Sequence, residues 1–440
     1  MKKISITTLG CKINQFESAS FQSSFEALGC SIVPFGQAAD VIIINTCTVT
    51  GKAGAQSRQC IRKAARTCPD AKIVITGCHA QMAAQELLEM KELQDIPLCI
   101  VGNGNKHLLV ETALQEDICD LSMLMGKISK KTDICHLPVR HFNDRTRAFL
   151  RVQDGCNSYC TYCIVPYTRG PSRSLPAAEV LAQAEIFAAE GHREIVVTGI
   201  HAGMYGKDLN EGKDIAALME DLCRATPDIR YRLSSIEPLE IHPQLLNVML
   251  RQQNFMPHLH IPLQSGDDEI LGRMNRRYKT RQFAEVIGLC RENLPDAAIG
   301  IDVLVGFPGE TGDNFANTQS FLEDLDCTYL HIFPYSKRPG TIASTFKSQV
   351  SKSIKEERVS ILRALGDRKK SLFYRKHIGT KRPVLVEGKR DNQGLLKGFT
   401  DNYIPVSFPG DDNLVNTIVT VKLLEVKDIN VSGIQCAGNG

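Results

Sequence analysis

The stretch that decides the fold is residues 155–163, which read Gly-Cys-Asn-Ser-Tyr-Cys-Thr-Tyr-Cys. Its cysteines, Cys156, Cys160 and Cys163, are spaced Cys-x3-Cys-x2-Cys and directly follow a predicted strand. Three thiolates in so short a loop can hold three corners of an iron–sulfur cube and leave one iron open to a ligand. A structural zinc ion would need a fourth ligand close by, and Ile164–Tyr167 supplies none. The alternative is a zinc site completed by a distant segment.

This loop opens a long alternation of strands and helices. Alternation of this kind predicts a parallel α/β fold, and six βα units in a row predict a partial barrel because a complete one has eight. The predicted strands are Ala148–Val152, Glu194–Thr198, Tyr231–Ser235, His258–Leu263, Ala298–Val305 and Thr328–Phe333. The predicted helices are Ala177–Glu190, Ile215–Ala225, Pro243–Arg251, Arg281–Glu292, Asn314–Leu325 and, closing the unit, Ile354–Arg375.

The segments on either side are of different types. Residues 1–118 alternate apolar strands with amphipathic helices and predict a separate parallel sheet covered on both faces. Residues 119–145 have weak periodicity and are predicted to be a linker to the core domain, 146–374. Residues 375–440 predict a small all-β domain, since short strands there follow one another without helices. The flanking strands are Ile4–Thr8, Val41–Asn45, Ile73–Thr76 and Leu98–Val101, then Pro383–Glu387, Leu395–Thr400, Ile404–Phe408 and Thr417–Val426.

Composition narrows the class of protein. The chain has 440 residues, 52 basic and 49 acidic, with a net charge of +3 that neither demands nor excludes nucleic acid. No apolar run approaches the roughly 18 residues of a membrane helix, and the N-terminus lacks a signal-peptide pattern. A soluble, cytoplasmic protein is therefore expected. In that reducing compartment, 16 cysteines point to metal ligands rather than disulfides.

A second set of cysteines lies in the first domain. Cys11, Cys47 and Cys78 each come just after one of the first three predicted strands. Carboxyl ends of neighbouring parallel strands lie at one edge of a sheet, so these thiols are expected to converge. Helix N-termini at that edge are expected to lower the thiol pKa values. The pattern favours a second iron–sulfur cluster, the alternative being ordinary buried cysteines. The other ten cysteines, Cys119 among them, have no ligand spacing.

The Cys-x3-Cys-x2-Cys loop after the first strand of a six-unit barrel resembles the radical S-adenosylmethionine superfamily. The resemblance implies a [4Fe–4S] cluster whose open iron chelates S-adenosylmethionine. It also implies that aromatic Tyr162 lies against the adenine and that Gly199 lies near the methionine end. Further polar residues, Glu237, Gln264 and Asp302, fall at carboxyl ends of later strands, where α/β proteins build their sites. Each of these is a candidate cofactor contact.

The full domain order resembles the methylthiotransferases. In that family the first domain carries an auxiliary [4Fe–4S] cluster and the last is an RNA-binding TRAM domain. Residues 45–50, Asn-Thr-Cys-Thr-Val-Thr, with Arg276-Arg277-Tyr278, most resemble the subgroup that modifies N6-threonylcarbamoyladenosine beside the tRNA anticodon. The resemblance implies two [4Fe–4S] clusters and two molecules of S-adenosylmethionine, one cleaved to a 5′-deoxyadenosyl radical and one donating methyl. It implies a tRNA anticodon stem-loop and an electron donor such as flavodoxin or ferredoxin as partners.

Two other functions remain open from the sequence. One is a sibling enzyme acting on isopentenyladenosine in tRNA or on an aspartate of a ribosomal protein; the other is a zinc-stabilised RNA-binding protein without radical chemistry. No general base is predicted, and neither the sulfur donor nor the oligomeric state can be inferred. RNA binding has independent support because Arg58, Arg62 and Arg66 repeat every four residues on one helix face. A solvated basic face explains that pattern nearly as well.

Overall fold

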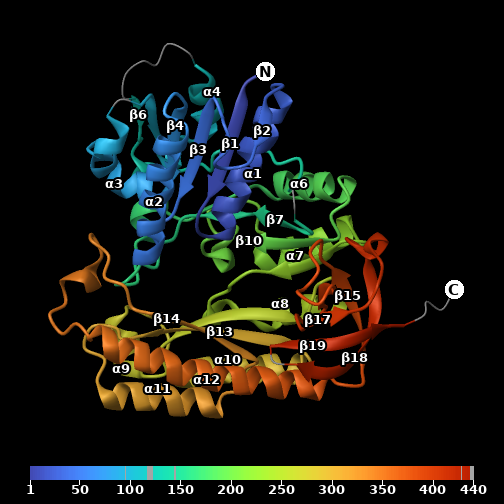
Figure 1. Cartoon of the computed structure of the whole chain (residues 1–440). Helices are drawn as coiled ribbons and strands as arrows, with labels where there is room; N and C mark the ends of the chain where they lie inside the picture. Colours follow the sequence, from blue (N-terminus) through green and yellow to red (C-terminus); the bar gives the residue numbers. More distant parts are fainter. Residues whose placement is uncertain (95, 116–121, 143–144, 428, 437–440) are drawn as a thin grey trace.

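The computed structural model describes residues 1–94, 96–115, 122–142, 145–427 and 429–436. Cys119 and part of the predicted linker lie outside these residues. Figure 1 shows three units: a sheet of N-terminal strands, a central α/β unit and a small β domain beside it. Within the described ranges, no helix is long and apolar enough to span a membrane.

The N-terminal unit is a six-stranded parallel sheet in the order β2-β1-β3-β4-β5-β6. Its middle strand, β3, is buried along its whole length because Val and Ile pack helices on both faces. The register pairs Thr8 with Asn45 and Thr46 with Gly77, so these strands end level with one another. The strands are β1 (Lys3–Thr8), β2 (Ser31–Val33), β3 (Val41–Thr46), β4 (Lys72–Gly77), β5 (Leu98–Val101) and β6 (Ser122–Leu124). The helices are α1 (Lys12–Ala27), α2 (Gly51–Thr67), α3 (Cys78–Leu88) and α4 (Leu109–Leu114).

The predicted linker 119–145 is not a simple tether where the structure describes it. Strand β6 lies inside it and pairs in parallel with β5. Beyond that strand, Leu137, Val139 and Phe142 are buried in the main hydrophobic core. The sequence pattern hid this because three-residue strands and single buried side chains produce no measurable period.

The central unit is a partial α/β barrel, as predicted. It consists of two parallel three-stranded sheets, β7-β10-β11 and β12-β13-β14, joined where the Ile236 amide donates to the His260 carbonyl. The strands are β7 (Arg147–Arg151), β10 (Glu194–Thr198), β11 (Arg230–Leu233), β12 (His258–Gln264), β13 (Ala298–Val305) and β14 (Tyr329–Pro334). The helices are α5 (Val165–Arg169), α6 (Ala177–Ala189), α7 (Ile215–Ala225), α8 (Pro243–Arg251), α9 (Asp268–Arg273), α10 (Thr280–Asn293) and α11 (Gly312–Asp324); β8 (Gln153–Asp154) and β9 (Arg173–Ser174) form a short hairpin.

Helix α12 (Lys352–Lys376) leads from the barrel into a closed five-stranded β-barrel. Four of its strands were predicted, and the fifth, β19, completes the barrel by pairing with both β17 and β18. Arg232 anchors it to the central unit by donating to the carbonyls of Thr400 and Asp401, each at 2.7 Å. The strands are β15 (Lys381–Val386), β16 (Leu396–Thr400), β17 (Pro405–Phe408), β18 (Ile418–Lys427) and β19 (Asn430–Gln435).

Candidate functional site

The cysteine loop after β7 and β8 forms a compact turn, called here the loop site (Cys156, Cys160 and Cys163). Gly155 precedes it with a φ of +75°, and a Cβ there would lie 1.9 Å from the Pro171 carbonyl oxygen. Only glycine fits such a position. Inside the turn, the Ser158 amide donates to Cys156 Sγ at 3.4 Å, and the Cys163 amide donates to the Cys160 carbonyl at 2.9 Å. The Cys156 and Cys160 thiols both act electrostatically on Cys163, so the three thiols lie near one another.

Two cations that sequence reasoning did not assign lie against these thiols. His201 Nδ1 lies 3.5 Å from Cys156 Sγ, and its Nε2 lies 2.6 Å from Glu240. Burial lowers the pKa of His201, but these two hydrogen bonds outweigh it and raise the pKa to about 10. Arg276 donates to Cys160 Sγ at 3.4 Å and pairs with Glu237. Burial of Cys156 is outweighed by hydrogen bonds from His201 and Ser158, which lower its pKa, whereas burial raises the pKa of Cys160 and raises that of Cys163 to about 12.

The other set of thiols, called here the strand-end site (Cys11, Cys47 and Cys78), is brought together by the sheet. A Cβ on Gly10, whose φ is +98°, would lie 2.6 Å from Cys47 Sγ. Asn103 Nδ2 lies 3.8 Å from Cys78 Sγ, and Cys11 Sγ lies 3.6 Å from Asn14 Oδ1. The Cys78 thiol acts electrostatically on both Cys11 and Cys47. Three residues far apart in sequence therefore share one location.

The expected lowering of the thiol pKa values at this location is wrong. Burial raises the pKa of Cys11, and Arg169 offsets it only in part. Burial and the neighbouring Cys78 raise the pKa of Cys47 to about 11. The cause is that desolvation disfavours the thiolate more than the helix N-termini favour it. Thiols of this kind become anionic when a metal displaces their protons.

The spacing between the thiol groups bears on which type of metal site they could form. In the described part of the chain, only His260, Asp302 and His331 form a group of three His, Cys, Asp or Glu side chains whose donor atoms all lie within 4.8 Å of one another. Neither cysteine set meets that limit. A tetrahedral zinc ion needs thiolates about 3.8 Å apart, whereas a four-iron cube is held by thiolates spaced more widely. The thiols of both sets are thus spaced more widely than a closed tetrahedral zinc site and are compatible with a four-iron cube.

A buried arginine joins the two sites. Arg169 Nη1 lies 3.1 Å from Glu17 and 3.0 Å from Asp154, and its Nη2 donates to Asn14 at 2.7 Å. Asn14 contacts Cys11, and Asp154 lies two residues before Cys156. Lys106 pairs with Glu17 from the other side. This network of buried charges fixes the N-terminal sheet against the cysteine loop, because breaking any one pair would leave a buried charge uncompensated.

Three of the predicted cofactor residues line one cavity. Tyr162, Gln264 and Asp302 face a space of about 300 Å³ that also touches Val49 and Thr50 of the first domain. Gln264 holds a φ of +71°, a strained conformation that is common at functional sites. Asp302 accepts from His260 Nε2 at 2.8 Å and lies 3.6 Å from His331 Nδ1. Although burial raises the pKa of Asp302, these imidazoles outweigh it and hold the pKa well below its usual range.

The other two predicted residues lie elsewhere. Gly199 closes β10 where a Cβ would lie 2.9 Å from Gln153 Oε1 and 3.1 Å from Ala202 Cα, so only glycine fits. Glu237 lines a separate cavity of about 260 Å³ with Cys160, His201 and Arg276. These two cavities lie on either side of the loop site, since one contains Cys160 and the other Cys163.

The basic face of α2 carries less free charge than its sequence indicates. Arg58 lies 3.6 Å from Glu86, and Arg62 lies 2.9 Å from Glu92. Arg66 is exposed and donates only to the Arg62 carbonyl in the described part of the chain. Two of the three guanidinium groups are thus paired with carboxylates from α3 and its following turn.

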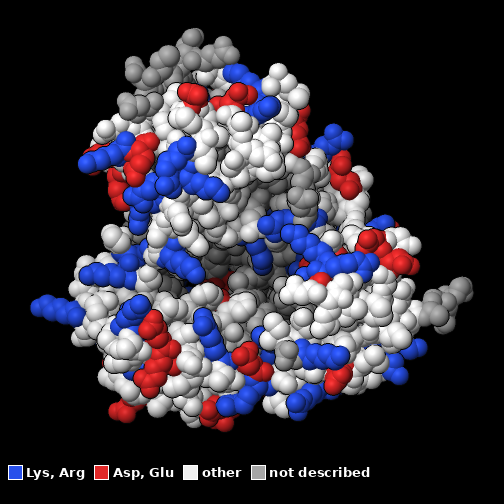
Figure 2. All heavy atoms as spheres, in the orientation of Figure 1, with Lys and Arg blue, Asp and Glu red and all other residues white. Residues whose placement is uncertain are grey.

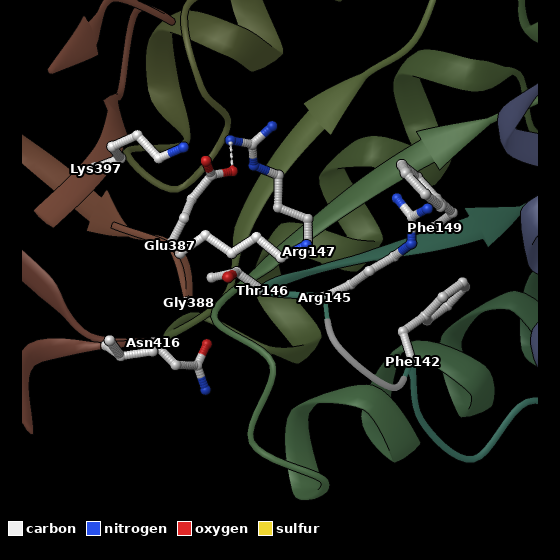
Figure 3. A pocket seen from close by; sticks show the side chains of 11 residues that line it. Phe142, Arg145, Thr146, Arg147, Phe149, Glu387, Gly388, Lys397 and Asn416 are labelled. Carbon is white, nitrogen blue, oxygen red and sulfur yellow. Dashed lines mark hydrogen bonds and ion pairs between the residues drawn. The ribbon is translucent and has the colours of Figure 1, made fainter. Parts of the chain in front are cut away.

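A larger basic cavity lies where the central unit meets the terminal β-barrel. Its volume is about 890 Å³, and its lining includes Arg145, Arg147, Lys389 and Lys397. Figure 3 shows Arg147 and Lys397 on opposite sides of Glu387, with Phe142 and Phe149 at the far end. Arg147 is held by Glu387 at 2.8 Å and Glu194 at 3.2 Å. Sequence reasoning missed this cavity because its walls come from two domains.

Comparisons with family models divide the chain as the structure does. Residues 150–322 match the radical SAM superfamily, residues 3–99 match Uncharacterized protein family UPF0004, and residues 375–431 match the TRAM domain. The predicted radical S-adenosylmethionine and TRAM domains are confirmed by these matches.

Curated relatives match over the whole chain. A protein of Bacillus subtilis named threonylcarbamoyladenosine tRNA methylthiotransferase MtaB is 37% identical, covering 97% of this chain and 94% of its own length. A protein of Fusobacterium nucleatum named tRNA-2-methylthio-N(6)-dimethylallyladenosine synthase is 32% identical, covering 98% and 99%. Among solved structures, a radical S-adenosylmethionine methyltransferase of Kitasatospora setae has a TM-score of 0.57 at 14% identity, covering 78% of this chain and 75% of its own. That structure supports the fold alone.

Proposed function

Because the chain belongs to the radical S-adenosylmethionine tRNA methylthiotransferase family, we propose that it adds a methylthio group to C2 of N6-threonylcarbamoyladenosine beside the tRNA anticodon. S-Adenosylmethionine and [4Fe–4S] clusters are the cofactors of this family. The observation that carries the proposal is the presence of two cysteine sites in one chain, joined through Arg169. A single-site enzyme would need only one of them.

The two cysteine sites would have different roles in the reaction. Cys156, Cys160 and Cys163 would hold one cluster, and Cys11, Cys47 and Cys78 a second. When bound, the first supplies the electron that cleaves S-adenosylmethionine, the second holds the sulfur, and a second S-adenosylmethionine supplies the methyl group. The target C–H bond is unactivated, so acid–base groups alone cannot functionalise it. This is why we assign no catalytic general base to the chain.

The remaining predicted residues would bind and orient the cofactor. Tyr162 offers an aromatic face in the same cavity as Gln264 and Asp302, which offer polar groups. Gly199 would lie near the methionine end, as the family resemblance implies, and the space beside its Cα is taken up by Gln153 and Ala202. Arg276 holds Glu237 next to Cys160, so both groups are fixed before a ligand arrives. Fixed polar groups around the loop site orient the reacting atoms without further ordering.

Binding of the tRNA anticodon stem-loop is supported by the TRAM domain and by the basic cavity beside it. Arg58, Arg62 and Arg66 would add phosphate contacts along a face of α2 that leads away from the Cys47 loop, although Arg58 and Arg62 are paired with carboxylates. We place the enzyme in the cytoplasm, where thiols stay reduced and where an electron donor such as flavodoxin or ferredoxin can reach it. The relative from Fusobacterium nucleatum supports dimethylallyladenosine as a second candidate substrate.

Mass spectrometry of tRNA nucleosides from cells with and without the gene tests this proposal. We expect the methylthio mark to vanish from threonylcarbamoyladenosine and to return on expression of the intact chain. Loss of the mark from isopentenyladenosine instead would favour the second candidate substrate, since isopentenyladenosine and dimethylallyladenosine are the same nucleoside. Unchanged tRNA would contradict both, and a ribosomal protein aspartate would then be the substrate to examine.

A further inference from the structure

We propose that Lys12 selects the substrate by binding the carboxylate of the threonyl group on N6-threonylcarbamoyladenosine. This inference rests on the proposed function. The threonylcarbamoyl group keeps the α-carboxylate of threonine, whereas an isopentenyl group is uncharged. A single cation placed beside the reacting base can therefore separate the two candidate substrates.

Lys12 lies in the cleft between two domains. It follows Cys11 directly and is the first residue of α1, so its backbone belongs to the strand-end site. Its side chain is exposed at the surface, yet desolvation by the surrounding protein lowers its pKa, helped by Arg147 of the barrel and opposed by Asp302 of the barrel and by Cys11. Figure 2 shows a deep hollow between the upper, N-terminal part of the molecule and the lower part. Lys12 is exposed and is acted on by charges of both domains, so it lies between them.

Lys12 is also free to accept a ligand. It has no hydrogen bond or ion pair within the part of the chain that the structure describes. The carboxylate that acts on it, Asp302, is already held by His260 and His331. Arg147, the other cation that acts on Lys12, is already held by Glu387 and by Glu194, which Arg230 and Arg232 also share. The ammonium group of Lys12 is therefore the charge left for an incoming anion.

A second cation near the strand-end site is less suitable. Arg338 acts electrostatically on Cys47, but its residue is only 8% exposed and its guanidinium donates to Ser336 Oγ at 3.0 Å. An anion on a flexible nucleoside side chain would have to displace this packing to reach it. Lys12 has a long stem and three rotatable donors, which suits a carboxylate that arrives with the substrate.

The test measures equilibrium binding of anticodon stem-loop RNAs to the reconstituted holoenzyme. The RNAs carry threonylcarbamoyladenosine, its neutral carboxamide analogue, or isopentenyladenosine. We expect the intact enzyme to prefer the carboxylate over the carboxamide by about 10- to 100-fold, the range of a charge-assisted hydrogen bond. In Lys12→Met that preference should disappear, because both RNAs then bind as weakly as the carboxamide binds the intact enzyme.

Two further variants separate charge from damage to the neighbouring site. Lys12→Arg keeps the positive charge and should keep the preference, and Lys91→Met, on an exposed turn (Lys91–Leu93), should behave as the intact enzyme does. Iron content, measured on every variant, reports the integrity of the strand-end site. A preserved preference in Lys12→Met, or equal weakening of all three RNAs as expected of a phosphate contact, overturns the inference. An intact enzyme that prefers isopentenyladenosine overturns the proposed substrate instead.

Discussion

The two cysteine sites reach similar chemistry by opposite routes. In the loop site, Cys156, Cys160 and Cys163 come from one turn, and local amide hydrogen bonds hold them. In the strand-end site, Cys11, Cys47 and Cys78 come from the ends of β1, β3 and β4, and only the register of the sheet brings them together. The ligands of the loop site thus come from one segment, with support from His201 and Arg276, whereas those of the strand-end site come together only if the whole sheet forms.

Arg169 offers a test of this comparison because it contacts residues beside both sites. These residues are Asn14, next to Cys11, and Asp154, two residues before Cys156. Replacement by Met in Arg169→Met removes one buried cation from Glu17 and Asp154, which leaves Glu17 with Lys106 and Asp154 with the more distant Arg173. We expect the free energy of unfolding to fall by about 3–5 kcal/mol, measured by urea denaturation. Iron binding at both sites should weaken together. Arg66→Met, at an exposed position without a carboxylate partner, is the control and should change stability by less than about 0.5 kcal/mol.

Low pH should weaken the network of buried charges around Arg169 that fixes the N-terminal sheet against the cysteine loop. Burial raises the pKa of Asp154, but Arg169, Arg173 and Arg151 outweigh it and lower the pKa to about 2. A carboxylate with a lowered folded pKa stabilises the fold fully above its unfolded pKa, near 4, and this stabilisation is lost as the pH falls through about 2. We expect about 2 kcal/mol of unfolding free energy to be lost between pH 5 and pH 2. Asp154→Asn should lose correspondingly less over that range, and identical losses in both proteins would contradict this explanation.

Substitution of a glycine beside the strand-end site tests whether that site can be damaged while the loop site stays intact. Gly10→Ala places a methyl group 2.6 Å from Cys47 Sγ, whereas Gly29→Ala, at a similar positive φ, meets nothing within 4 Å. Both should lose about 1–2 kcal/mol of stability because their φ angles are unfavourable for alanine. Only Gly10→Ala should also lose iron from the strand-end site while retaining cleavage of S-adenosylmethionine. Equal iron contents in the two variants would show that this close contact does not matter.

The smallest effect is expected on the basic face of α2. Arg66 is free of carboxylates in the described structure, whereas Arg62 pairs with Glu92. Arg66→Gln should therefore weaken binding of the anticodon stem-loop a few-fold and lower the salt dependence by about one phosphate contact. Arg62→Gln should change it less. Affinity for S-adenosylmethionine should be the same in both variants, and the reverse order of RNA affinities would contradict the assignment.

Much of this architecture could be predicted from sequence because its signals are periodic. The six barrel strands and the three parallel strands that lead to Cys11, Cys47 and Cys78 all lie within two residues of their predicted positions. Strands β2 and β6 were missed because each has only three residues. Strand β19 was missed because the last predicted strand, Thr417–Val426, ends with β18, and Asn430–Gln435 was assigned to no strand.

The partners of the thiols could not be predicted, since they depend on tertiary contacts. His201 and Arg276 are distant in sequence from the cysteines they contact, and although Arg276 belongs to a stretch that resembles a substrate subgroup, neither context predicts a contact with a thiol. Arg169 lies only six residues after Cys163, but its partners Asn14 and Glu17 come from the first domain. The thiol pKa values were predicted in the wrong direction because burial cannot be judged before the fold is known.

The central claim is that the two cysteine sites have different tasks, and one reaction tests it directly. Two triple variants would be reconstituted with iron and sulfide, given S-adenosylmethionine, reductant and stem-loop RNA, and analysed for 5′-deoxyadenosine and methylthiolated nucleoside. The variant with Cys156→Ala, Cys160→Ala and Cys163→Ala should form neither product. The variant with Cys11→Ala, Cys47→Ala and Cys78→Ala should form 5′-deoxyadenosine but no methylthiolated nucleoside. Methylthiolated nucleoside from that second variant, or loss of 5′-deoxyadenosine from both variants alike, would contradict the account.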